Sequence, residues 1–211
     1  MIVSITSLKG GVGKSTLTQN LAVCFAHMDY KVAIVDADIN ASSERWSGLR
    51  DNDEYPPIMT VSIDTPKALR NNVTLLERDY DIVLIDGTPA LSKLVSTIML
   101  LGDVILVPIK PSILDIWATE RFQERYEEAV TLKGESIPGY FILNEYNARM
   151  TFNQEVKEAV NDLGFKIMES SVKTRQAYKE AIQYGMGVYE YKDKKAKTEI
   201  TKLANEIIGI L

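Results

Sequence analysis

Short apolar runs alternate along the chain with longer segments in which apolar residues recur every three or four positions. The short runs are rich in β-branched residues, and several are apolar at consecutive positions, as in strands buried on both faces of a sheet. The predicted strands are Ile2–Thr6, Lys31–Asp36, Ile82–Asp86, Val104–Ile109, Gly139–Leu143 and Lys166–Met168. The predicted helices are Lys14–Met28, Pro66–Arg78, Lys93–Leu101, Ile116–Lys133, Asn153–Leu163, Arg175–Tyr184 and Lys195–Ile208. This alternation predicts an α/β fold, a doubly wound, mainly parallel sheet with helices on both faces.

Composition narrows the class of protein. With 211 residues, 45% hydrophobic and 25% charged, the chain is expected to form one domain over residues 1–211, in which Arg50–Pro57 is a polar loop. Its one cysteine, Cys24, and one histidine, His27, exclude an internal disulfide, a zinc site and an iron–sulfur cluster held within one chain. His27 lies in an apolar helical run, which excludes a Ser-His-Asp triad. We find no signal peptide and no membrane-spanning run, and expect a cytoplasmic protein.

A glycine-rich loop follows the first predicted strand directly. It reads Lys9-Gly10-Gly11-Val12-Gly13-Lys14-Ser15-Thr16 and leads into a helix. Three glycines let successive backbone N–H groups turn toward an anion, and the positive end of the helix dipole points to the same place. Lys14 is then expected to neutralise the β- and γ-phosphates and the Ser15 hydroxyl to bind Mg²⁺, which predicts a P-loop NTPase.

The same loop carries a resemblance to a known family. Leu8 stands where the general phosphate-loop pattern has its first glycine, and the K-G-G-x-G-K-[ST] sequence resembles the deviant Walker A motif of the ParA/MinD ATPases. The resemblance implies that ATP and Mg²⁺ are the cofactors and that Lys9 reaches the nucleotide of a partner subunit. Taken alone, a lysine before a glycine loop is also typical of a solvated charge.

Two carboxylates follow the second predicted strand at alternate positions. Asp36 and Asp38 therefore share one side of the chain near the carboxyl edge of the sheet, where doubly wound folds bind ligands. The resemblance makes Asp38 the residue that positions the attacking water and Asp36 a support of the magnesium shell. The family usually has D-x-D-P here, and Ile39 replaces the proline. A solvated loop acid is the alternative for Asp38.

The third predicted strand resembles a Walker B segment. Four apolar residues deliver Asp86 to the sheet edge, where it is expected to bind magnesium through water. The following Gly87-Thr88-Pro89 is a candidate switch that senses the γ-phosphate. On its own this pattern also fits α/β proteins that bind no nucleotide.

Two further stretches match the family more loosely. The segment from Val107 to Asp115 resembles the P-x-x-P-S-x-L-D stretch of the small plasmid-partition ATPases of the ParF type. Ser112 and Asp115 are also ordinary helix-capping residues. Asn144 follows a strand at the position where the resemblance implies a contact with the adenine edge, and asparagine is equally a turn former.

The last third of the chain differs in charge from the rest. Between Lys173 and Lys202 there are eight basic and four acidic residues, in a chain whose net charge is −5. Such a surface suits sequence-neutral binding to nucleic-acid phosphates, although a solvated helix face gives the same count. The candidate DNA-binding residues are Lys173, Arg175, Lys179, Lys194 and Lys195.

The family resemblance covers nearly the whole chain and implies a ParA-type ATPase. Such an enzyme forms an ATP-dependent homodimer, binds nucleoid DNA nonspecifically and partitions a plasmid or another cargo with a small ParB-like, centromere-binding or adaptor partner that stimulates hydrolysis. Whether dimers assemble further stays open. The alternatives are a MinD-like membrane-cycling ATPase, a P-loop metabolic kinase or ligase, and a nucleotide-gated scaffold without turnover. We interpret the C-terminal segment from Ile200 to Leu211 as a helix packed on the domain, and so expect no membrane partner.

Overall fold

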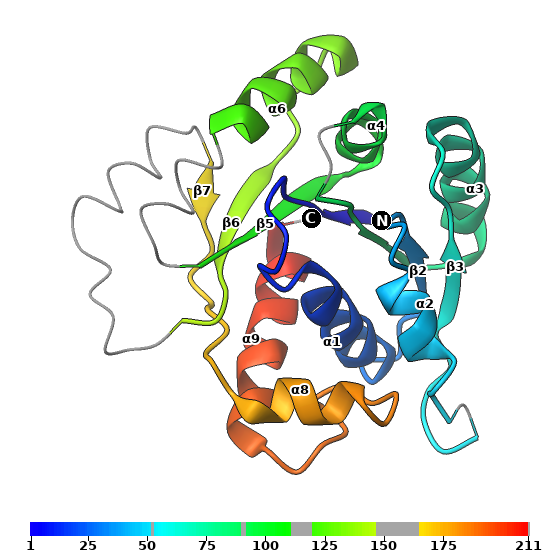
Figure 1. Ribbon diagram of the computed structural model, residues 1–211, viewed down its shortest axis with the longest axis vertical. Coiled ribbons are helices and arrows are strands. Elements are labelled where there is room, and N and C mark those ends of the chain that lie inside the picture. The colour runs from blue at the N-terminus through cyan, green and yellow to red at the C-terminus, as the bar shows by residue number, and fades with distance from the viewer. Residues whose placement is uncertain (52, 90–91, 111–119, 147–164, 211) are drawn as a thin grey trace.

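The computed structural model describes residues 1–51, 53–89, 92–110, 120–146 and 165–210. Within these ranges seven strands form one sheet in the order β3-β2-β4-β1-β5-β6-β7, and all pairings are parallel (Figure 1). The strands are β1 (Ile2–Ile5), β2 (Val32–Asp36), β3 (Met59–Ser62), β4 (Ile82–Asp86), β5 (Val104–Ile109), β6 (Gly139–Leu143) and β7 (Lys166–Ile167). The predicted α/β fold with a parallel sheet is confirmed.

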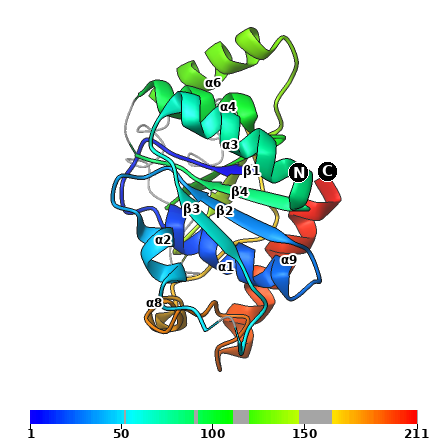
Figure 2. The same cartoon turned by 90° about the vertical axis from the view of Figure 1, so that its right-hand side faces the viewer.

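Helices cover both faces of this sheet. They are α1 (Lys14–Ala26), α2 (Ser42–Ser47), α3 (Pro66–Asp79), α4 (Lys93–Leu101), α6 (Glu120–Lys133), α8 (Gln176–Ile182) and α9 (Lys194–Ile210). Figure 2 shows α3, α4 and α6 on one face and α1, α2, α8 and α9 on the other. The helices that connect β1 to β2, β3 to β4 and β4 to β5 thus cover one face or the other, which is why β1, β2, β4 and β5 are buried on both sides.

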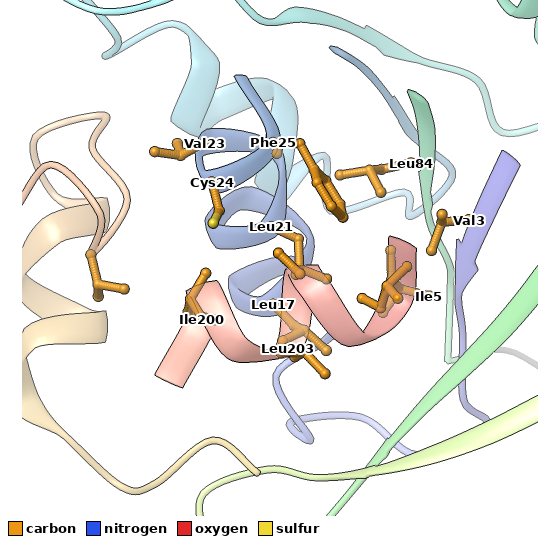
Figure 3. Packing of buried hydrophobic residues seen from close by; sticks show 14 of the residues in the cluster. Val3, Ile5, Leu17, Leu21, Val23, Cys24, Phe25, Leu84, Ile200 and Leu203 are labelled. Atoms are coloured by element: carbon orange, nitrogen blue, oxygen red, sulfur yellow. The ribbon is translucent and has the colours of Figure 1, made fainter. Parts of the chain in front are cut away.

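The buried side chains of the central strands divide between these two layers. Side chains alternate between the two faces of a strand. Val3 and Ile5 of β1 therefore pack in the cluster under α1 and α9, whereas Ile2 packs on the opposite face, in the cluster under α3 and α4. In the first cluster, Leu17 of α1 and Leu203 of α9 are both buried and lie close together (Figure 3). The prediction that the C-terminal helix packs on the domain is therefore confirmed. Among the described helices, none has the length and apolarity needed to cross a bilayer.

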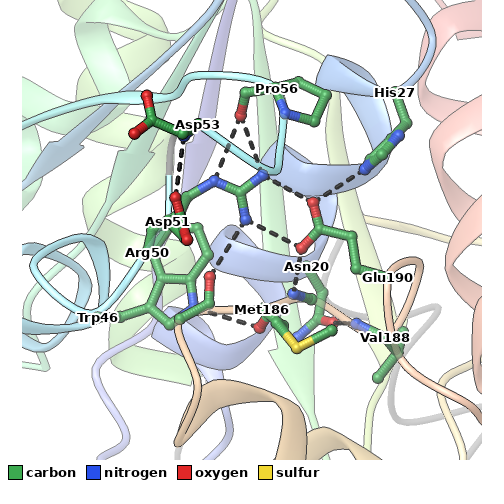
Figure 4. A network of polar contacts seen from close by, with 12 residues as sticks. Asn20, His27, Trp46, Arg50, Asp51, Asp53, Pro56, Met186, Val188 and Glu190 are labelled. Carbon is green, nitrogen blue, oxygen red and sulfur yellow. Dashed lines mark hydrogen bonds and ion pairs between the residues drawn. The ribbon is translucent and has the colours of Figure 1, made fainter.

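A buried polar network ties the segment after α2 to the loop before α9 (Figure 4). The Arg50 guanidinium donates to both carboxylate oxygens of Glu190, at 2.7 and 2.9 Å, and to the backbone carbonyls of Pro56 and Gly185. The Glu190 carboxylate also lies 2.9 Å from Nε2 of His27, the residue that directly follows α1. This network holds α2, which follows the Asp36–Asp38 segment, against α1 and the body of the domain.

Two elements were absent from the sequence prediction. The edge strand β3 has four residues, none of which is buried, and α2 has six, so neither has a clear hydrophobic period. The other described strands agree with the prediction to within one residue, and α1 ends at Ala26, two residues before the predicted Met28. The predicted helix Asn153–Leu163 and the predicted start of α6 at Ile116 lie outside the described residues.

Candidate functional site

The loop between β1 and α1 is open on its outer side. Gly11 and Gly13 adopt positive φ angles of 71° and 88°, which glycine reaches without strain. A Cβ atom built at Gly10 or Gly11 would meet nothing within 4 Å. At Gly13 it would lie 2.3 Å from Nδ2 of Asn144, so a side chain there would have to displace the Asn144 amide. The glycines thus leave space along the outer side of the loop and allow close packing on its inner side.

Lys14 is the first residue of α1, and its side chain folds back over the loop. The residue is only 6% exposed, and Nζ donates to the Lys9 carbonyl oxygen at 2.9 Å. Burial lowers the pKa of Lys14, while the nearby charges of Asp86 and Asp38 raise it. A buried ammonium beside an open glycine loop favours a negatively charged ligand, because the ligand's charge compensates the free-energy cost of removing the lysine charge from water.

Asp86 ends β4 beside this lysine and is fully buried. Its Oδ2 accepts a 2.7 Å hydrogen bond from the Ser43 hydroxyl, and Oδ1 has no hydrogen-bond partner within the described part of the chain. Burial raises the pKa of Asp86 to about 7, with a further upward effect from Asp36, while the nearby Ser43 and Ser15 hydroxyls and the charge of Lys14 act in the opposite direction. A buried carboxylate with one open oxygen is suited to a cation or a cation-bound water.

These residues fit Mg²⁺ bound together with a nucleotide. No group of three or more His, Cys, Asp or Glu that could hold a metal occurs in the described residues. Mg²⁺ usually takes one or two protein ligands and completes its shell with water and phosphate oxygens. Ser15 and Asp86 can supply the protein part of such a shell.

Asp36 lies next to Asp86 in register across β2 and β4. Its Oδ2 accepts hydrogen bonds from the backbone N–H groups of Ser43 and Glu44, at 2.7 and 3.1 Å, and its Oδ1 accepts one from Asp38 N at 3.1 Å. The carboxylate therefore satisfies the first N–H groups of α2, where a negative charge is favourable. Its predicted support of the magnesium shell stays a prediction.

Asp38 lies on the loop between β2 and α2 and is half-buried. Its Oδ1 accepts 2.9 Å hydrogen bonds from the backbone and side-chain nitrogens of Asn40. Its charge acts on Lys14, which places the carboxylate within the electrostatic reach of the phosphate loop. The adjacent Ile39 is 85% exposed. The role of Asp38 in positioning water stays a prediction.

Asn144 reaches the phosphate loop from β6. It is buried, and Nδ2 donates to the Val12 carbonyl oxygen at 2.7 Å. It also lines a pocket beside the loop, whose wall includes Gly13, Thr16 and Tyr178. The predicted adenine contact of Asn144 stays a prediction.

The five candidate DNA-binding residues lie in different environments. Lys173, Lys179, Lys194 and Lys195 are exposed, whereas Arg175 forms an ion pair with Glu199 at 2.6 Å. Lys173, Arg175 and Lys179 line the pocket beside the phosphate loop. Lys194 and Lys195 lie in the first turn of α9 and do not line that pocket.

Gly87, the first residue of the candidate switch after β4, is tightly packed. A Cβ atom at Gly87 would lie 2.7 Å from the Thr6 side chain and 2.9 Å from the Ile5 carbonyl, so only glycine fits. Thr88 is buried. The stretch from Pro111 to Asp115, including Ser112, lies outside the described residues.

Sequence reasoning missed two polar residues beside the carboxylates, of which Ser43 contacts them directly and Gln19 contacts Ser43. Ser43 donates to Asp86, and Gln19 Nε2 donates to Ser43 Oγ at 3.3 Å. The signal for Ser43 was its position, seven residues after Asp36 at the start of a helix that the hydrophobic pattern did not show. Gln19 lies one turn after Ser15 on α1 and had no motif to mark it.

The chain is similar in sequence and in structure to known positioning and partition proteins. A protein that maintains carboxysome distribution, from Halothiobacillus neapolitanus, is 27% identical over 98% of this chain and 95% of its own. A ParA protein from Rhizobium radiobacter is 24% identical over 92% of this chain and 87% of its own. The solved cell division ATPase MinD of Pyrococcus furiosus superposes with a TM-score of 0.82 at 24% identity, covering 100% of this chain and 99% of that one.

A family model decides the membership. The model of the CobQ/CobB/MinD/ParA nucleotide-binding domain matches residues 3–188, which include the phosphate loop, both carboxylate-bearing strands and Asn144. ParA and MinD ATPases use ATP and Mg²⁺, so the predicted cofactors are confirmed at the level of the family. The fold, the open phosphate loop and the family model together show that this chain belongs to the CobQ/CobB/MinD/ParA family, among its ParA/MinD-type ATPases.

Proposed function

We propose that this protein hydrolyses ATP with Mg²⁺ and, as an ATP-dependent dimer, positions or partitions a plasmid or another cargo on DNA. In this proposal residues 1–211 form one ATPase domain. The observation that carries it is the buried Lys14 ammonium beside Asp86, with the open glycine loop around them. That arrangement supplies a site for phosphates and a cation in one place.

The chain's own residues divide the work of catalysis. Backbone N–H groups of the loop and Lys14 bind and orient the phosphates, and Mg²⁺ supplies charge neutralisation when it is bound. Ser15 and Asp86 hold the ion, and Asp38 orients the attacking water. In this mechanism the rate of ATP hydrolysis comes from positioning the phosphates and the water and from electrostatic stabilisation of the transition state.

Lys9 gives the sharpest test of the dimer. Its backbone accepts the Lys14 hydrogen bond, so the side chain can be changed without removing that contact. Lys9→Ala is expected to bind ATP as a monomer with little loss, and to fail to dimerise and to hydrolyse ATP. Size-exclusion runs in the Asp38→Ala background measure dimerisation, and phosphate release by Lys9→Ala alone measures hydrolysis. Weakened monomer binding with dimerisation retained at saturating ATP would reject the proposed dimer.

DNA binding is the finer part of the proposal and rests on the exposed lysines of the C-terminal third. A dimer presents each lysine twice, so binding should need ATP, ignore sequence and weaken linearly in a log–log plot against salt. Lys194→Glu with Lys195→Glu is expected to abolish binding without changing ATP affinity. Lys67→Glu is the matched control, since Lys67 is exposed on α3 across the sheet.

Two outcomes of the DNA experiment would contradict this part. They are equal binding in the ADP and ATP forms, and binding that the α9 reversals leave intact in fluorescence anisotropy with a duplex of arbitrary sequence. The partner is proposed to be a small ParB-like or adaptor protein, and its addition should raise phosphate release.

The membrane-cycling alternative is tested with vesicles. The apolar residues Ile200, Leu203 and Ile207 of α9 are buried against the domain, so this helix does not present them to a bilayer. Co-sedimentation with anionic liposomes in ATP but not in ADP would favour a MinD-like role. Phosphate release that requires a small-molecule acceptor would favour a metabolic kinase or ligase, and ATP binding without turnover would favour a scaffold.

A further inference from the structure

Ser43 is a buried serine that uses both of its donors on carboxylates. It lies in the first turn of α2 and is 0% exposed. Its backbone N–H donates to Asp36 Oδ2 and its hydroxyl donates to Asp86 Oδ2, each at 2.7 Å. One residue therefore joins the carboxylates that end two neighbouring strands.

The contact decides which oxygen of Asp86 stays open. Asp36 and Asp86 are register partners on β2 and β4, and both are buried. With Oδ2 held by Ser43, Oδ1 is the oxygen that has no hydrogen-bond partner in the described structure. A carboxylate fixed through one oxygen presents the other in a single direction.

The hydroxyl itself is oriented from α1. Gln19 Nε2 lies 3.3 Å from Ser43 Oγ and 3.3 Å from the Ser42 carbonyl oxygen. Since the single hydroxyl hydrogen is donated to Asp86, the Gln19 amide is the donor to Ser43. With the Asp86 carboxylate as the acceptor, the order of donation runs from Gln19 to Ser43 to Asp86.

We propose that Ser43 is a positioning residue for the magnesium site: it holds Asp86 so that Oδ1 faces the ion shell beside Ser15. The proposal rests on the proposed function, since it requires a nucleotide–Mg²⁺ complex in the phosphate loop. Ser43 does not touch the ion or the nucleotide and acts only through Asp86. Residues that orient the groups around a metal typically matter about 10- to 100-fold for metal affinity.

The test measures Mg²⁺ coupling without turnover. ADP is titrated calorimetrically into the full chain, once in EDTA and once in excess Mg²⁺, and the ratio of the two Kd values gives the gain that Mg²⁺ provides. Ser43→Ala removes the hydroxyl and keeps the backbone bond to Asp36. We expect this gain to fall about tenfold or more, with the Kd in EDTA unchanged. In ATP hydrolysis, the half-saturating Mg²⁺ concentration should rise while kcat at saturating Mg²⁺ is retained.

Matched variants separate positioning from packing. Ser42→Ala removes the neighbouring exposed hydroxyl and should leave the gain as in the parent, and Ser43→Thr, which keeps a hydroxyl, should restore most of it. If Ser43→Ala does not fold, Ser43→Cys fills the same space with a weaker donor and gives the same comparison.

The results that overturn the proposal are specific. A parental Mg²⁺ gain in Ser43→Ala, or an equal loss of ADP affinity with and without Mg²⁺, would show that Ser43 does not act on the ion. A parent protein that binds no ADP in either condition would instead refute the proposed ATPase and, with it, the site that Ser43 would position.

Discussion

Arg50→Met removes one partner of a buried ion pair. The side chains of Arg50 and Glu190 are 0% and 1% exposed, and their closest atoms lie 2.7 Å apart. Methionine has a similar length and fills the space of the arginine stem. It leaves the Glu190 carboxylate buried with the Gly187 N–H and His27, and it leaves the Pro56 and Gly185 carbonyls without their donor.

The expected cost follows from burial and from the number of contacts. Removing one member of a buried pair typically lowers the free energy of unfolding by about 3–5 kcal/mol, because the other charge remains desolvated. For a domain of this size, ~1 kcal/mol lowers Tm by roughly 2–4 °C. The Tm of Arg50→Met should therefore fall by roughly 6–20 °C.

Urea denaturation and calorimetry of the nucleotide-free protein measure this effect. Arg45→Met is the control, since Arg45 is exposed on α2, just before the segment that carries Arg50, and its loss should change the free energy of unfolding by less than ~0.5 kcal/mol. In the double variant Arg50→Met with Glu190→Met, much of the stability should return because no charge is left buried. A cost below ~1 kcal/mol for Arg50→Met, or no recovery in the double variant, would refute the reasoning.

Three further predictions concern the site. Lys14→Gln should abolish ATP binding while far-UV circular dichroism stays unchanged, because the lysine charge and the loop amides act on the same phosphates; near-parental affinity by titration would contradict the loop assignment. Asp38→Ala should keep ATP and Mg²⁺ binding and lose turnover, since orienting water matters in the transition state; hydrolysis at the parental rate would remove this role from Asp38. The folded-state pKa of Asp86 is raised to about 7, so the carboxyl holds a proton that the unfolded chain releases near pH ~4. Its contribution to stability is complete below that pH and is lost as the pH rises to about 7. Without nucleotide and Mg²⁺, the stability advantage of Asp86→Asn over the parent should therefore be larger at pH ~8 than at pH ~5, as measured by urea denaturation at both pH values; an equal difference at the two would exclude the raised pKa.

Much of the fold was predictable because its central strands are buried on both faces. A run of consecutive apolar residues such as Ile82–Ile85 can be recognised as a strand without knowing which strand it pairs with. The strand β3 has no such run, since Met59 and Ser62 are exposed and Thr60 and Val61 are half-buried. Its pairing with β2 is a tertiary effect that local pattern does not contain.

In the site, too, features that depend on local sequence were predictable, and contacts between distant segments were not. The phosphate loop was predictable because its chemistry depends on consecutive residues, and the family model includes it. Ser43 and Gln19 were not, because their contacts join α1, α2 and β4 across the fold. Arg175 was expected to bind DNA from its charge, and a net count of charges cannot show that Glu199 on α9 already pairs with it.

The packing of α1 against α9 has a consequence for how the chain folds. The helix that follows the phosphate loop ends at Ala26, and the helix that covers it begins at Lys194, about 170 residues later. Contacts this distant in sequence form slowly, since a large loop must close before they stabilise anything. At synthesis rates of ~5–20 residues per second, roughly 8–34 s separate the emergence of the two helices from the ribosome. During that interval Leu17 and Leu21 lack the side chains of Ile200 and Leu203 that share their buried cluster in the finished protein, so this face of α1 emerges before the helix that covers it.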